Sequence, residues 1–163
     1  MFFLRFNYKK GDKKFQLKKE LHLTHQHSPR ANEVNEKYCR RWVSLEVLQG
    51  ISKGKEEHLF DMQISNFPKD NMKYLVLSSA TKDPFKENHY RSISIGLLIN
   101  KQLKRKINFI ADPKIKIREV GVTCERCAIK DCAVRQVPAI ALDKAAKNKK
   151  TERIVEELNN KFG

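Results

Sequence analysis

The sequence predicts an α+β fold: an antiparallel sheet of five to seven strands, a long helix packed on it, and a small cysteine-rich C-terminal module. Apolar and polar side chains alternate near the N-terminus, a period that is typical of strands. Apolar residues at helical spacing follow between residues 34 and 48. We therefore expect an α+β domain over residues 1–120, the cysteine-rich module over 121–138, and a basic C-terminal helix over 139–163.

The first elements form a predicted hairpin. The alternation from Phe2 to Tyr8 resumes from Phe15 to Leu23 across residues 10–13, which predict a turn. Ser28 and Pro29 then mark a helix start, because a hydroxyl side chain caps free backbone amides and proline has none to satisfy. The predicted helix covers residues 29–49 and ends at Gly50, with Cys39 beside its apolar stripe.

The middle of the chain predicts the remaining strands. Alternating or continuous apolar runs indicate strands at residues 60–64, 74–77, 93–99, 107–110 and 115–122. The polar stretch 79–90 predicts a long connection, as in a lid or binding loop. A short helix is expected at 100–105. In the C-terminal helix, one face carries Ile154, Val155, Leu158 and Phe162, and the basic stretch 144–150 precedes it.

Composition favours a globular protein with a strongly basic surface. The chain has 163 residues, with 34 Lys and Arg against 19 Asp and Glu, a formal net charge of +15. A polyanionic partner is one interpretation and a solvated surface is the other. The sequence contains no apolar stretch of the roughly 20 residues that a membrane span needs. We expect a cytoplasmic protein, where cysteine clusters bind metal more often than they form disulfides.

Three of the four cysteines lie within nine residues, at Cys124, Cys127 and Cys132. A Cys-x2-Cys pair presents two thiolates to one metal ion, and this pattern predicts a structural zinc site that needs a fourth ligand. Cys39 is the remaining cysteine. Imidazoles also suit zinc, so the substitute ligands are His22, His25 and His27. An iron–sulfur cluster and a metal-free set of buried thiols are the alternatives.

Other polar groups have both a functional and a structural interpretation. Arg126 or Arg135 could donate to the thiolates of a metal site, or could be solvated on a short helix. Phosphates could be bound by the basic stretch 144–150 or by Lys101, Lys104, Arg105 and Lys106, although such runs are usually solvated. A ligand pocket on the sheet could be lined by Ser78, Ser79, Ser92 and Ser94. No nucleophile elbow or phosphate-binding loop occurs, so we do not expect an enzyme.

Two stretches resemble bacterial transcriptional regulators of the XRE type, including the short-chain fatty acyl regulator group. The first is VTCERCAIKDCAVRQVP at 122–138, and the second is NEVNEKYCRRW at 32–42, which includes Cys39. These regulators have an N-terminal helix-turn-helix and a long C-terminal regulatory region. The resemblance implies a regulatory domain, which we expect to be sensor-like in the manner of GAF or PAS domains.

The chain differs from that family in the N-terminal region that binds DNA. Its first sixty residues predict a hairpin and one long helix in place of the helix-turn-helix, so we expect the regulatory region alone, as in a fragment or a shortened protein. The predicted function is ligand or metal sensing, with indirect control of DNA through a separate helix-turn-helix within a homodimer. The alternative is a small basic zinc protein that binds nucleic acid directly.

Overall fold

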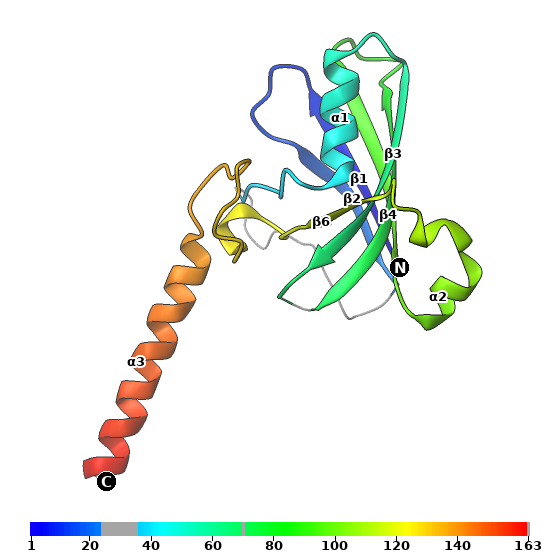
Figure 1. Cartoon of the computed structure of the whole chain (residues 1–163). Helices are drawn as coiled ribbons and strands as arrows, with labels where there is room; N and C mark the ends of the chain where they lie inside the picture. Colours follow the sequence, from blue (N-terminus) through cyan, green and yellow to red (C-terminus); the bar gives the residue numbers. More distant parts are fainter. Residues whose placement is uncertain (24–35, 70, 163) are drawn as a thin grey trace.

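The computed structural model describes residues 1–23, 36–69 and 71–162. These residues form a six-stranded sheet in the order β2-β1-β5-β4-β3-β6 (Figure 1). The strands are β1 (Phe2–Lys9), β2 (Gln16–His22), β3 (His58–Phe67), β4 (Met72–Lys82), β5 (His89–Leu98) and β6 (Lys116–Glu119). Neighbours are antiparallel except for β3 and β6, which run parallel. The predicted α+β class is confirmed, with one parallel pair at the sheet edge.

The predicted N-terminal hairpin is confirmed as β1 and β2. Its side chains alternate as expected, with Phe2, Leu4 and Phe6 buried on one face of β1. Gly11 in the connecting turn has a φ of +93°, a backbone conformation that glycine adopts without steric cost. The turn therefore explains why the period of two stops and restarts at this point.

The main core lies between helix α1 (Val43–Lys53) and one face of the sheet. Leu48 and Ile51 of α1 are fully buried there against apolar side chains of the strands. Gly96 of β5 faces the ring of Phe2 so closely that a Cβ atom would lie 2.1 Å from a ring carbon. A glycine at this position thus leaves room for the Phe2 ring.

The long helix predicted over residues 29–49 is wrong in its extent. Helix α1 begins only at Val43 and continues through Gly50 to Lys53. Residues 36–42 are non-helical because their backbone pairs with a distant segment, described below. Gly50 does not end the helix; a Cβ there would lie 2.7 Å from Leu59, so close packing explains it. The predicted start at Ser28 and Pro29 lies outside the described residues.

Helix α2 (Lys101–Lys106) leads into the 3-10 helix η1 (Asn108–Ala111), and isoleucines at and beside η1 cover one end of the second face of the sheet. The predicted short helix is confirmed as α2, capped by the Asn100 side chain, which accepts from the Leu103 amide. The strand predicted at 107–110 is wrong. Ile107 and Ile110 are three residues apart, so one 3-10 turn aims both at the sheet, and both pack near Ile64.

The remaining strands are confirmed but have different bounds. Residues 60–64, 74–77 and 93–99 fall in β3, β4 and β5, while β6 covers only four residues of the predicted 115–122. Because β4 and β5 extend into the stretch 79–90, only residues 83–88 connect them. Asp83 closes this turn by accepting from the Phe85 amide. The long lid-like connection predicted from its polarity is therefore wrong.

Helix α3 (Ile140–Phe162) extends away from the sheet (Figure 1). Its bounds lie close to the predicted 139–163, and it contains the basic stretch 144–150. Its N-terminal end contacts the 3-10 helix η2 (Cys124–Arg126), whereas Ile154, Val155 and Leu158 farther along remain 47–49% exposed. None of the helices in the described residues is long and apolar enough to cross a membrane.

Candidate functional site

The cysteine-rich run packs against the segment that precedes α1. Tyr38 and Thr123 form an isolated antiparallel bridge. On either side of it, the Cys39 amide donates to the Val122 carbonyl at 3.1 Å, and the Cys124 amide donates to the Lys37 carbonyl at 2.8 Å. This pairing brings Cys39 beside a segment that lies 85 residues later in the sequence.

Buried carboxylates reinforce the same contact. The Glu125 carboxylate accepts from the Lys37 amide at 2.9 and 3.1 Å. On the opposite segment, the Glu36 carboxylate accepts from the Thr123 hydroxyl at 3.0 Å and from Arg126 Nε at 2.7 Å. Each segment therefore inserts one acidic side chain into the hydrogen-bond network of the other, and charge-assisted bonds of this kind are among the stronger ones.

Trp42 links the site to the core. Its indole Nε1 donates to the Gly121 carbonyl at 2.8 Å, and its ring contacts Phe6 and Tyr38 with centroid separations of 6.0 and 5.9 Å. Gly121 also faces Cys127, since a Cβ at residue 121 would lie 2.7 Å from the Cys127 sulfur. The backbone of residues 121–127 thus packs against the segment that precedes α1.

Three of the four thiols are buried together. Cys39, Cys124 and Cys127 are 5%, 6% and 7% exposed, and Cys132 is half-buried. Burial raises the pKa of the Cys39 thiol to about 11, an effect that backbone hydrogen bonding from Gly121 and Arg41 only partly offsets. The neighbouring Cys127 and Cys124 thiols contribute in the same direction as burial. Without a cation nearby, Cys39 is a neutral thiol at physiological pH.

Arg135 holds the cysteine-rich run in its folded shape. Its guanidinium donates to the carbonyls of Cys124 at 2.9 Å and Cys127 at 3.2 Å, and also to that of Ile129. The hydrogen bonds of Arg135 thus go to backbone carbonyls, and Arg126 pairs with the Glu36 carboxylate, so donation to thiolates stays a prediction. Of the short helix expected around them, only the three-residue 3-10 turn η2, which ends at Arg126, is formed.

The thiols do not form a ready ligand set. Among the described residues, no group of three or more His, Cys, Asp or Glu side chains is arranged to hold a metal ion. One sulfur contact points toward thiolate stabilisation: the Gln136 amide donates to Cys124 Sγ at 3.5 Å. Of the substitute ligands, His22 pairs with Glu20 on β2, and His25 and His27 lie outside the described residues.

The serines of the sheet do not line a ligand pocket. Ser78, Ser92 and Ser94 are at most 1% exposed beneath α1, and Ser79 faces the opposite side, where it is exposed. The cavity between α1 and the sheet has a volume of about 10 Å³, with room for one water molecule. The predicted ligand site on this face is therefore wrong, because small side chains there let α1 pack closely.

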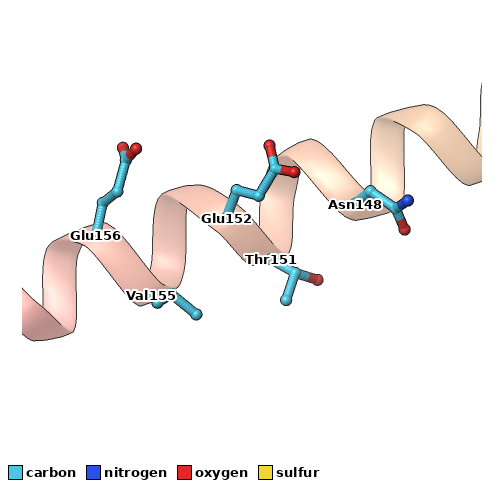
Figure 2. Close-up of a pocket in the computed structure, with 5 residues that line it drawn as sticks. All are labelled: Asn148, Thr151, Glu152, Val155 and Glu156. Carbon is cyan, nitrogen blue, oxygen red and sulfur yellow. The ribbon is translucent and has the colours of Figure 1, made fainter.

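The remaining basic candidates lie on exposed helices. On α2, the side chains of Lys101, Lys104, Arg105 and Lys106 are all exposed. Figure 2 shows a shallow surface along α3 whose lining residues, Asn148 to Glu156, all come from that one helix. With no second element to enclose a ligand, this surface is one side of a helix and not a binding site.

Comparisons with protein-family models, curated proteins and solved structures find no match for this chain. The functional argument therefore rests on the residues themselves. Sequence reasoning identified all four cysteines, but it missed the roles of Glu36, Glu125 and Trp42. Their side chains act through partners almost 80 to 90 residues away, and no local pattern marks such pairs.

The burial of the thiols predicts their order of reaction. In the metal-free protein at pH 8, we expect iodoacetamide to alkylate Cys132 first and Cys39 last. Cys39 is buried and has a pKa of about 11, so roughly a thousandth of it is thiolate at that pH. Mass spectrometry of peptides from timed samples gives the rates. Denatured protein, in which all four thiols should react alike, is the control; equal rates for Cys39 and Cys132 in folded protein would refute the expectation.

Proposed function

We propose that this chain is the regulatory region of a bacterial transcription regulator, in which Cys39, Cys124, Cys127 and Cys132 hold one structural zinc ion. The observation that carries the proposal is the interlocking of residues 36–42 with residues 121–127. These segments belong to the two stretches that resemble XRE-type regulators. Their pairing gives a physical reason for both stretches, including Cys39, to occur in one sequence.

The irregular course of the cysteine-rich run supports a metal ion. Between β6 and α3, the only regular element is η2, a single turn of three residues. Connections of this length without regular structure are uncommon in compact domains unless something else holds them. Four thiolates around zinc would do so, because metal binding contributes directly to the stability of small modules.

Metal binding requires a local rearrangement. The four sulfur atoms would have to turn toward one point, and Cys132, the most exposed, would have to move inward. The cation would convert Cys39 from a neutral thiol to a thiolate by lowering its pKa. An iron–sulfur cluster would need the same four thiolates, and elemental analysis separates the two.

Regulation would be indirect. We place the protein in the cytoplasm as a homodimer that acts on DNA through a separate helix-turn-helix, without a catalytic role. A metal ion or small ligand that binds two states of this domain with different affinity would shift their balance. The clamp between residues 36–42 and 121–127 is the element that such binding would tighten or release.

Binding to duplex DNA tests this proposal against its rival. The regulatory region alone should bind a labelled 20-base-pair duplex no more tightly than about 10⁻⁴ M near physiological salt, as fluorescence anisotropy would measure. A nucleic-acid-binding zinc protein would instead bind at micromolar concentration or below, with affinity falling steeply between 50 and 200 mM salt. That second result would replace the regulatory proposal with direct binding through basic residues such as those of α2.

A further inference from the structure

We propose that a basic groove beside the cysteine clamp binds a small ligand that carries phosphate groups, of the size of a nucleoside phosphate. The groove lies between the start of β2, with the turn that precedes it, and residues 36–40, and its cavity volume is about 370 Å³. Five cationic residues line it: Lys13, Lys14, Lys18, Lys37 and Arg40. The volume is in the range of small-molecule sites.

The acidic side chain in the groove lining is already neutralised. Glu36 is the one carboxylate among those lining residues that the structure describes, and its side chain is 4% exposed. Its oxygens accept from Thr123 and Arg126 on the far side of the segment. The groove therefore presents an excess of positive charge that Glu36 does not offset, and low-dielectric walls strengthen the attraction of such a surface for anions.

Arg40 gives the groove a fixed anion-binding group. Its guanidinium carbon lies 4.3 Å from the centroid of the Phe15 ring, and Nη2 donates to the Lys13 carbonyl at 3.0 Å. Within the described part of the chain, no carboxylate forms an ion pair with Arg40. A guanidinium held over an aromatic ring has a restricted position, and its planar set of donors suits the oxygens of a phosphate group.

The surroundings of Arg40 favour an anion over water. Arg40 is half-buried beside the Phe15 ring, so its charge is less well solvated than on an open surface. The oxygens of a bound phosphate would compensate the charge of Arg40 in place of water. The flexible lysine side chains at the rim would contact the rest of the ligand. Lys37 and Arg40 lie on either side of Cys39 in the sequence, so a ligand in the groove would also affect the clamp between residues 36–42 and 121–127. This link to regulation rests on the proposed function, whereas phosphate binding does not.

Binding of a fluorescent adenosine triphosphate derivative tests the groove. We expect the double variant Lys18→Gln/Arg40→Gln to bind it at least 10-fold more weakly than the natural sequence. A second variant, Lys18→Gln/Lys37→Gln, keeps the Arg40–Phe15 contact and should lose affinity as well. The matched control is Lys53→Gln/Lys55→Gln, which removes two exposed charges at the C-terminal end of α1 and should change affinity less than 2-fold.

Competition separates the sources of the phosphate. Inorganic phosphate should displace the derivative weakly, and unlabelled adenosine triphosphate should displace it fully. Equal loss of affinity in the groove and control variants would overturn the proposal, since it would mean that net charge alone attracts the ligand. Absence of nucleotide binding at millimolar concentration, or binding of a DNA duplex without binding of the nucleotide, would overturn it too. Both results concern phosphate binding and do not test the metal ligands, so failure of the groove proposal is distinct from failure of the proposed zinc site.

Discussion

Cys124→Ala is expected to abolish zinc binding and to lower the melting temperature by about 8–16 °C in zinc-containing buffer. A metal present at 1,000 times its dissociation constant stabilises the folded state by about 4 kcal/mol. For a chain of this size, each kcal/mol corresponds to about 2–4 °C. Because Cys124 lies where residues 121–127 meet residues 36–42, its loss should also free the cysteine-rich run from the core. Thermal unfolding followed by circular dichroism measures the shift.

A chelator separates the loss of metal from the loss of packing. The natural sequence in excess chelator should melt close to Cys124→Ala, and the chelator should leave the variant unchanged. Cys132→Ala is the second variant, since its half-buried side chain contributes less to packing but is equally required as a ligand. If the chelator has no effect on the natural sequence while Cys124→Ala still melts early, Cys124 stabilises the fold by packing alone.

Trp42→Ala is expected to cost about 3–5 kcal/mol in the free energy of unfolding, the range found when a buried aromatic side chain is removed. The indole is 5% exposed, packs on Phe6, and donates to the Gly121 carbonyl. The variant would therefore lose core packing and one tie between the core and the cysteine-rich run. Urea unfolding followed by circular dichroism gives the free energy.

Two further substitutions divide that effect into parts. Trp42→Phe keeps an aromatic ring but leaves the buried Gly121 carbonyl without its donor, so we expect a loss of about 1–3 kcal/mol. Phe85→Ala is the matched surface control, because Phe85 is 93% exposed and its removal should change stability by less than about 0.5 kcal/mol. A loss at Trp42→Ala no greater than that at Phe85→Ala would contradict the placement of Trp42 between core and clamp.

Local patterns predicted the strands well and the long helix poorly. The alternation of Phe2, Leu4 and Phe6 reports one buried sheet face, and the face it predicts is the one that α1 covers. Tyr38 and Trp42 also match helical spacing with the apolar residues of α1, yet Tyr38 is half-buried and Trp42 buried for another reason. Their segment pairs with residues 121–124, and spacing within one segment carries no information about a distant partner.

The same limit applies to the candidate site. Clustering within nine residues is a local signal, so Cys124, Cys127 and Cys132 were evident from the sequence. That Cys39 lies near Cys124 could be suspected from the sequence only because Cys39 is the one cysteine outside the cluster. Glu125 and Arg135 look like ordinary surface charges in the sequence. In the fold, Glu125 accepts from the Lys37 amide and Arg135 donates to the Cys124 carbonyl, roles that are visible only when both segments are placed.

Elemental analysis of the purified protein, combined with a thiol titration, tests the central claim most directly. We predict one zinc ion per chain, with all four thiols protected from a thiol reagent until a chelator or denaturant is added. Iron with sulfide in place of zinc would assign the same ligands to a cluster. No bound metal, together with four thiols that titrate freely, would contradict the proposed metal clamp.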